Sequence, residues 1–229
     1  LARYNSDGSL DTTFGGQKPY PPRTVGLSIG LGTQETLHSA AVQPDGKIVI
    51  VGVSSTYVNG QSVSQRVLAR FQSNGALDKT FGENGTGIVE PPLGSLVKIQ
   101  QAGEESKILV AGTAPTMTGG FALARYNLNG TLDTTFGDNG LIIDHFTDDD
   151  QLFAMDVDEG GNIVLAGWVE NSASGYDYGV ARYRPNGARE TDFSGDGFVS
   201  TDIAAGALDD ALAVAFQADG KIVAAGKTI

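Results

Sequence analysis

An arginine and a carboxylate recur together, eight residues apart, four times along the chain. In the first copy the intervening turn is centred near Asp7, so Arg3 and Asp11 should face each other across two strands. Opposite charges placed in this way form a cross-strand ion pair worth about 0.2 to 1 kcal/mol. The expected pairs are Arg3 with Asp11, Arg70 with Asp78, Arg125 with Asp133, and Arg182 with Glu190. A single active site needs its residues only once, so fourfold recurrence favours a structural role over ligand contact.

Acidic turns supply oxygen ligands at several places. They are Asp138-Asn139-Gly140, the run Asp148-Asp149-Asp150, Asp192 with Asp196, and Asp209-Asp210. A hard cation such as calcium prefers oxygen ligands, but no stretch matches the twelve-residue calcium loop that ends in glutamate. Solvated acidic turns are therefore the competing interpretation. Asp148, Asp149 and Asp150 are the strongest metal candidates, and calcium is the one cofactor for which the sequence offers ligands.

Aromatic residues fall into two classes. One aromatic residue directly follows each recurring arginine, and a phenylalanine ends each segment of the Leu-Asp-Thr-Thr-Phe type. Both sets repeat with the same period, which is typical of packing between repeats. Aromatic residues outside this pattern are better candidates for ligand contact, because loops on a rigid scaffold often carry function. These candidates are Tyr20, Tyr57, Trp168, Tyr176 and Tyr178. Trp168 directly follows an apolar strand, so packing is its competing interpretation.

Few residues support catalysis. The two histidines, His38 and His145, are far apart in sequence and lack the spacing of a zinc site. The chain has neither a Gly-x-Ser-x-Gly elbow nor a phosphate-binding loop. Glycoside hydrolysis needs only two suitably spaced carboxyl groups, and in so acidic a chain it stays an alternative, although no pair stands out. We predict a noncatalytic protein with no catalytic residue.

Composition limits the partners. The 229 residues carry a formal net charge of -12, with 32 glycines and no cysteine. An acidic surface repels nucleic acid, and no run of about 18 apolar residues is present, so we expect neither nucleic-acid binding nor membrane insertion. The absence of cysteine excludes disulfides and thiolate metal sites. Because the chain begins inside a repeat, we expect a processed product or a piece of a longer repeat array.

Two alternating motifs divide the chain into repeats of about 60 residues. One is of the Leu-Ala-Arg-Tyr type and begins at Leu1, Leu68, Leu123 and Val180. The other is of the Lys-Ile-Val type, ends in glycine, and spans 47–52, 107–112, 162–167 and 221–226. The second motif is apolar at odd and even positions alike, so both faces of its strand must be covered. The central strand of a propeller blade between two other blades meets that requirement.

Each repeat is expected to hold four strands joined by hairpins, because short turns such as Pro44-Asp45-Gly46 precede the Lys-Ile-Val strands. A longer acidic connection is expected at 101–106, and variable binding loops at 54–64 and 170–176. Joining the first Leu-Ala-Arg-Tyr strand to the last Lys-Ile-Val strand would complete a fourth blade. We predict an all-β fold: one β-propeller domain over 1–229, with four four-stranded blades closed by pairing the N- and C-terminal strands of one repeat.

The succession Leu-Ala-Arg-Tyr-Asn, Asp/Asn-Gly, Leu-Asp-Thr-Thr-Phe-Gly and Val-Gln-Pro-Asp-Gly-Lys-Ile-Val resembles the delta-sixty repeat family of bacterial, mostly surface or secreted, β-propeller-like proteins. The resemblance covers essentially the whole chain. The fourth copy departs from the pattern at Arg189-Glu190-Thr191-Asp192. The resemblance implies an extracellular or cell-surface repeat scaffold and carries over no general catalytic motif.

Three functions follow from these observations. The first is a noncatalytic extracellular binding or surface-display module that recognises a glycan or protein through blade-edge loops. The second is a carbohydrate-active hydrolase with a carboxylate pair. The third is a structural repeat spacer of a larger surface protein.

Overall fold

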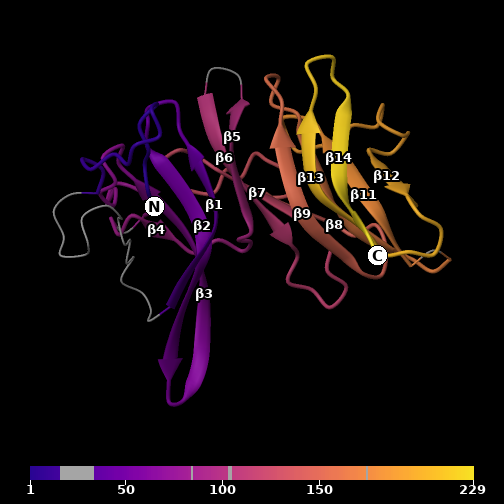
Figure 1. Ribbon diagram of the computed structural model, residues 1–229, viewed down its shortest axis with the longest axis horizontal. Coiled ribbons are helices and arrows are strands. Elements are labelled where there is room, and N and C mark those ends of the chain that lie inside the picture. The colour runs from indigo at the N-terminus through magenta and orange to yellow at the C-terminus, as the bar shows by residue number, and fades with distance from the viewer. Residues whose placement is uncertain (16–33, 84, 103–104, 174) are drawn as a thin grey trace. The chain divides into compact units, whose positions relative to one another are not determined.

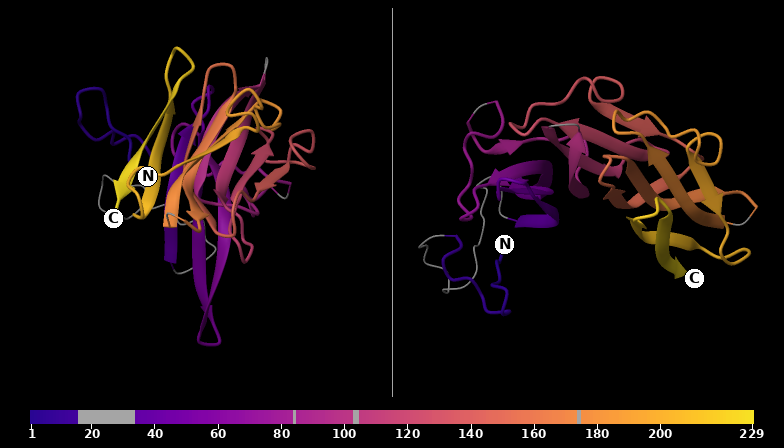
Figure 2. Two further views of the ribbon diagram at one scale, coloured as in Figure 1. Left: turned by 90° about the vertical axis from the view of Figure 1, so that its right-hand side faces the viewer. Right: turned by 90° about the horizontal axis from the view of Figure 1, so that it is seen from above.

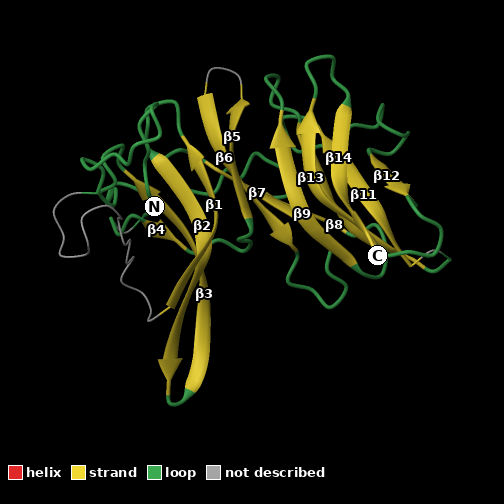
Figure 3. Ribbon diagram, in the orientation of Figure 1, coloured by secondary structure: helices red, strands yellow, loops and turns green. Residues whose placement is uncertain are grey.

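The computed structural model of the chain describes residues 1–15, 34–83, 85–102, 105–173 and 175–229, which contain fourteen β-strands (Figure 1, Figure 3). Three groups of four consecutive strands form antiparallel sheets in the orders β1-β2-β3-β4, β5-β6-β7-β8 and β9-β10-β11-β12, and β13 pairs with β14 alone. This all-β architecture of repeated four-stranded sheets is propeller-like. Within the described ranges, the structure has no helix long and apolar enough to cross a membrane.

The strands follow one another in the order that the repeats predict. The first sheet contains β1 (Gln34–Val42), β2 (Ile48–Val58), β3 (Gln61–Phe71) and β4 (Ile88–Val89). The second contains β5 (Leu96–Ala102), β6 (Glu105–Thr113), β7 (Phe121–Tyr126) and β8 (Leu141–Asp144). The third contains β9 (Asp150–Val157), β10 (Ile163–Asn171), β11 (Gly175–Tyr183) and β12 (Phe198–Thr201), and the last pair is β13 (Asp209–Phe216) and β14 (Ile222–Thr228).

The three predicted loops are paired strands instead. Strands β2 and β3 stay in register out to Val58 opposite Gln61, across the whole of 54–64. Asn59 and Gly60 both have positive φ, 51° and 82°, as the tight turn of a two-residue hairpin requires. Pairing likewise extends to Asn171 opposite Gly175 in the β10–β11 hairpin and to Ala102 opposite Glu105 in the β5–β6 hairpin. The loop predictions were wrong because they gave too little weight to strand-forming residues beyond the apolar motif and to the Asn-Gly turn.

The Lys-Ile-Val strands are deeply buried in each complete sheet. Residues 108–111 of β6 and 163–166 of β10 are entirely inaccessible to solvent. The matching strand β14 is different, since Val223 is 48% exposed. The apolar character of these strands therefore arises from coverage of both faces, and β14 has less of that coverage within the described residues.

Three of the Lys-Ile-Val motifs end in a glycine that is required because a backbone carbonyl of the neighbouring strand approaches it closely. The neighbouring strands β1, β9 and β13 each contain a bulge opposite it. The bulge brings a carbonyl oxygen so near that a Cβ at Gly167 would lie 1.8 Å from the oxygen of Gln151, and one at Gly226 would lie 1.7 Å from that of Asp210. No larger residue fits there without moving the backbone.

The chain divides into two compact units, 1–91 and 92–229. The first unit holds the β1–β4 sheet, around a core of Ile50, Val67, Ala69 and Phe71. In the second unit, Leu109, Phe121 and Leu123 pack against Leu165 and Tyr183, which joins the β5–β8 and β9–β12 sheets.

A second cluster in the same unit joins the β9–β12 sheet to β13 and β14. It contains Val164 and Ala166, with Val214, Phe216 and Ile222 packed against them. The views of Figure 2 show β13 and β14, in yellow, beside the orange strands of that sheet.

Among the described residues, two paired strands, β13 and β14, represent the fourth predicted blade. Within the described residues, the first Leu-Ala-Arg-Tyr segment forms no sheet, and its ladder contact is an isolated bridge between Tyr4 and Leu10. The sheets are therefore repeated and propeller-like.

Candidate functional site

The recurring arginine lies in a compact corner built from its own repeat. In the third copy, Arg125 Nε donates to Asp133 Oδ2 at 2.8 Å, and the guanidinium lies 4.5 Å from the ring centroid of Phe136. The other carboxylate oxygen of Asp133 accepts from the backbone N–H and the hydroxyl of Thr135. Equivalent corners are formed by Arg3, Asp11, Thr13 and Phe14, and by Arg70, Asp78, Thr80 and Phe81. These residues serve the fold in each repeat.

The fourth copy differs from the predicted pattern. Glu190 accepts from Arg184, with Nη2 to Oε1 at 3.0 Å, and does not pair with Arg182. The Nε of Arg182 is buried without a hydrogen-bond partner among the described residues. In the complete corners a threonine two residues after the aspartate donates its hydroxyl to the carboxylate. In the fourth copy this position is Asp192, which has no hydroxyl. The predicted Arg182–Glu190 pair was wrong for this reason.

Charge in the buried corners is balanced. Burial alone would raise the pKa of Asp133, but the hydrogen bonds from Thr135 and the charges of Arg125 and Lys107 more than offset it, so the pKa is lowered. The same balance, with Thr80 and Arg70, lowers the pKa of Asp78. Both carboxylates are ionised at neutral pH and bind a guanidinium.

Three of the five candidate aromatic residues gather on one hairpin. Trp168 pairs with Tyr178 across β10 and β11, and the ring of Trp168 lies 4.2 Å from that of Tyr176 by centroid distance, tilted by 54°. All three are partly exposed. Burial, followed by the charges of Asp209 and Asp210, raises the pKa of Tyr178.

The other two candidates lie elsewhere. Tyr57 is 63% exposed on the β2–β3 hairpin of the first unit. Tyr20 falls outside the described residues. The aromatic candidates therefore do not all contribute to one described surface.

The Asp148–Asp150 run does not present three converging carboxylates. Asp150 is fully buried, and its carboxylate accepts the backbone N–H groups of Phe146 and Thr147 and the hydroxyl of Thr147. Asp148 is exposed, and the backbone carbonyl of Asp149 accepts from the N–H of Glu170. Asp150 thus fixes the chain between β8 and β9.

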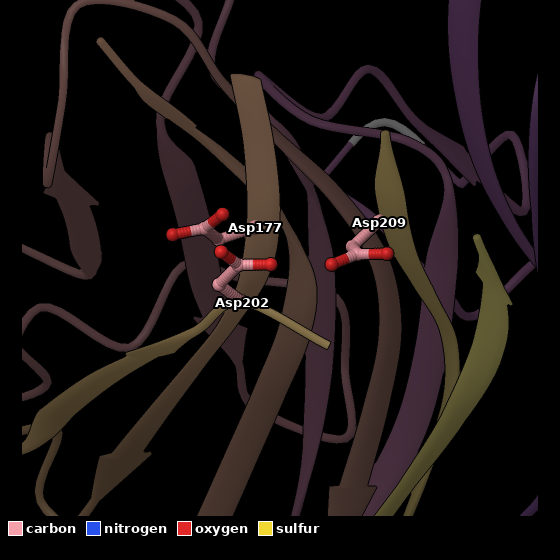
Figure 4. A group of neighbouring side chains, drawn as sticks. All are labelled: Asp177, Asp202 and Asp209. Carbon is pink, nitrogen blue, oxygen red and sulfur yellow. The ribbon is translucent and has the colours of Figure 1, made fainter. Parts of the chain in front are cut away.

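A different group of carboxylates does converge. One oxygen each from Asp177, Asp202 and Asp209 lies within 4.8 Å of the others (Figure 4). Asp177 is on β11, Asp202 directly follows β12, and Asp209 begins β13. A parallel bridge between Tyr176 and Leu208 brings the starts of β11 and β13 together.

Two of these side chains are held firmly. Asp177 Oδ2 accepts from Asn171 Nδ2 at 2.7 Å and from the Ser200 hydroxyl at 3.0 Å. Asp209 Oδ2 accepts from the N–H groups of Ile203 and Ala204 at 2.7 and 3.2 Å. The nearby Thr228 hydroxyl, and then these N–H groups, outweigh burial and lower the pKa of Asp209.

Sequence reasoning found Asp209, in the acidic pair Asp209-Asp210, but missed Asp177 and Asp202. They belong to separate strands and meet only through the sheet. A signal was available in the repeats, because both positions are acidic in this copy and not in the preceding one, where Gly120 and His145 occupy them.

The fold and these sites define a class of protein, namely an all-β protein of propeller-type repeats, three of which have the arginine–aspartate corner. The family model of the beta-propeller domain of unknown function (DUF5122) matches residues 1–14, 43–81, 106–136 and 161–193, together more than half of the chain. The chain belongs to this propeller-type repeat family. No curated protein matches it significantly.

Proposed function

We propose that the protein is a noncatalytic, extracellular or cell-surface binding module that recognises a glycan or protein ligand with the β10–β11 hairpin. The observation that supports this most directly is the contact between Trp168 and Tyr176, which are partly exposed and absent from the equivalent positions of the other repeats. Rings of this kind offer a large rigid contact area with a polar edge. Glu170, opposite Tyr176 in the register and exposed, adds a hydrogen-bond acceptor beside them.

A carbohydrate-active hydrolase has less support. A glycosidase needs a carboxylic acid whose pKa is raised so that it stays protonated. The described carboxyl groups with a displaced pKa, among them Asp78, Asp133 and Asp156, are displaced downward. Such groups are ionised and paired, which suits structure better than acid catalysis.

We also propose which repeat family, within the propeller-type proteins, the chain belongs to. We place the chain with the delta-sixty repeat proteins because the motifs from Leu-Ala-Arg-Tyr to Lys-Ile-Val recur through its length. That placement is the support for a surface or secreted location.

We further propose that Leu1–Tyr4 pairs with β14 and completes a fourth blade. In the three complete sheets, the first isoleucine of the Lys-Ile-Val strand pairs with the aromatic residue of the next strand, as Ile48 does with Phe71. The same register would place Tyr4 opposite Ile222. The spacer role is the second candidate, because the half-exposed β14 could instead pair with a further repeat of a longer array.

The ligand-binding proposal is tested by a glycan-array screen of the full chain, followed by titration of any glycan that binds. We expect Trp168→Ala to weaken binding at least about tenfold, as loss of an aromatic anchor does. Tyr57→Ala, which removes an exposed aromatic from the other unit, is the matched control and should bind like the parent.

Two results would count against the β10–β11 hairpin as a glycan site. One is folded parent protein that binds no glycan, which leaves a protein ligand or the spacer role. The other is a Trp168→Ala variant that binds as well as the parent.

A further inference from the structure

The three converging carboxylates have the dimensions of a cation site. Calcium binds oxygen at about 2.3 to 2.6 Å, so two oxygens on one ion lie no more than about 5 Å apart. The oxygens of Asp177, Asp202 and Asp209 satisfy that limit in every pair, since all lie within 4.8 Å of one another. The distances alone allow a site, and a second observation makes it specific.

That observation is a buried oxygen without a partner. Asp209 is inaccessible to solvent, and its Oδ1 accepts no hydrogen bond of acceptable geometry among the described residues, although the Thr228 hydroxyl lies near this carboxylate. A buried polar atom left unsatisfied costs about 1 to 3 kcal/mol, and more when it is charged. In native proteins such an atom usually marks a bound water or ion.

The preceding repeat shows what normally satisfies this oxygen. Asp150 occupies the equivalent position at the start of β9, and its Oδ2 likewise accepts the N–H of the second residue past the preceding strand, here Phe146. Its Oδ1 accepts the hydroxyl of the next residue, Thr147. In the last repeat that residue is Ala204, whose N–H still donates to Asp209 but which has no hydroxyl.

The lost hydroxyl coincides with a gain of negative charge. The strand registers, Phe121 opposite Asp144 and Tyr178 opposite Thr201, make Gly120 equivalent to Asp177 and His145 equivalent to Asp202. Two carboxylates therefore appear beside the one aspartate whose oxygen has lost its donor. Three like charges so close together repel unless a cation or a proton neutralises them.

Two of the three carboxylates have no basic partner among the described residues. Within the described part of the chain, neither Asp202 nor Asp209 forms an ion pair with a lysine or arginine, and the nearby Lys227 is bound to Asp210. Asp177 is oriented by Asn171 and Ser200 through one oxygen. Hydrogen bonds that hold a ligating carboxylate in this way are typical support for metal ligands.

We infer that Asp177, Asp202 and Asp209 bind a divalent, oxygen-preferring cation, and that the cation is calcium. All three ligands are carboxylates, which favours a hard ion over zinc. They come from β11, the segment after β12, and β13, with room for water on the exposed side at Asp202, and calcium tolerates such irregular coordination better than magnesium does. Asp177 lies on β11 between Tyr176 and Tyr178, but the cation site does not depend on the proposed ligand.

The site would tie the last repeat to its neighbour. Bound calcium would connect β11 and β13 through side chains, next to the backbone bridge between Tyr176 and Leu208. Calcium binding would therefore raise the thermal stability of the protein, because a ligand that binds only the folded state stabilises it.

The experiment is a calorimetric titration of calcium into the full chain after chelator treatment, paired with thermal unfolding with and without calcium. We expect the parent to bind calcium and to unfold at a higher temperature with it. Asp202→Asn should weaken binding at least about tenfold and remove the thermal shift. Asp202 is exposed, and its side chain forms no hydrogen bond or ion pair with the described residues, so this variant should fold.

Two controls make the result decisive. Asp192→Asn removes one exposed carboxylate from the same unit and should bind calcium like the parent. Asp148→Asn removes a carboxylate from the acidic run at 148–150 and should also bind normally. Absence of calcium binding in the parent, or unchanged binding by Asp202→Asn, would overturn the inference, as would loss of binding in Asp148→Asn with Asp202→Asn unaffected.

Discussion

The same arginine–aspartate pair carries different energetic weight in different repeats, because its burial differs. The side chain of Arg125 is 8% exposed and also donates to the Pro185 carbonyl at 2.7 Å, whereas that of Arg3 is 41% exposed. Removing one partner of a buried pair leaves an uncompensated charge, whereas exposed pairs are screened by water.

We therefore expect Arg125→Ala to lower the free energy of unfolding by about 3 to 5 kcal/mol. Arg3→Ala, the same change at the equivalent position, should cost less than about 1 kcal/mol. Urea unfolding of both variants measures the difference. Equal losses would show that the pair contributes through its local geometry and not through burial.

Acid should destabilise the buried corners. The pKa of Asp133 is lowered in the folded chain, so it binds protons less readily than in the unfolded chain, where the ordinary value of 3.8 applies. Its contribution to stability is thus complete above about pH 4 to 5 and is lost as the pH falls through the lowered folded value.

Asp133→Asn removes that titration. Between pH 5 and pH 2.5, the unfolding free energy of the parent should fall more steeply than that of this variant, measured by urea unfolding at each pH. Asp192→Asn, at an exposed position, should follow the parent curve. Parallel curves for the parent and Asp133→Asn would contradict the role assigned to this carboxylate.

Residues close in sequence were predictable, and residues joined by the sheet were not. The offset of eight between arginine and aspartate places both on one local turn, so three corners follow from spacing alone. The fourth failed because its geometry depends on a hydroxyl two residues further on, which Asp192 lacks. Asp177 and Asp202 meet Asp209 only through strand register, which no local pattern encodes.

At the scale of elements, the bulge and its facing glycine act as one unit. At Gly167, an added Cβ would lie 1.8 Å from the backbone oxygen of Gln151. Strands β5 and β6 pair without a bulge, and a Cβ at the equivalent Gly112 would lie 3.2 Å from the hydroxyl oxygen of Ser95. A side chain is easier to displace than a strand backbone.

Gly167→Ala should therefore lower stability by about 3 kcal/mol or more, at the upper end of overpacking costs, and Gly112→Ala by about 1 kcal/mol. Thermal or urea unfolding of the two variants provides the comparison. A similar cost for both would mean that β9 shifts freely, and the bulge would then not explain the recurring glycine.

The central strands could be predicted because burial of both faces leaves a plain apolar pattern. The ends of the β2–β3 strands have a weaker signal, because beyond the apolar motif it consists of β-propensity and the Asn59-Gly60 turn. The element order was therefore predictable, whereas the length of each hairpin was set by the pairing partner.

At the scale of the whole molecule, closure can be tested with engineered cysteines, because the chain has none of its own. The register of the complete sheets would place Ala2 opposite Ala224. We expect Ala2→Cys with Ala224→Cys to form a disulfide within one chain under mild oxidation, detected by gel mobility and mass spectrometry.

The matched control is Ala2→Cys with Lys227→Cys. Position 227 lies three residues, or about 10 Å, further along β14, and this displacement prevents a disulfide with position 2. A cross-link between two chains would favour the extended array over the closed ring. No cross-link from the first pair would show that Leu1–Tyr4 does not pair with β14 in that register.

The local corners also bear on how the chain folds. The arginine–aspartate bond of each complete corner closes a loop between residues eight apart, which costs little chain entropy. Proteins rich in such contacts have low contact order and fold faster than sheets joined only by remote strands. Three independent corners give the chain three sites from which folding can begin, so a mutation that disables one should slow assembly of its own repeat while the others still nucleate theirs.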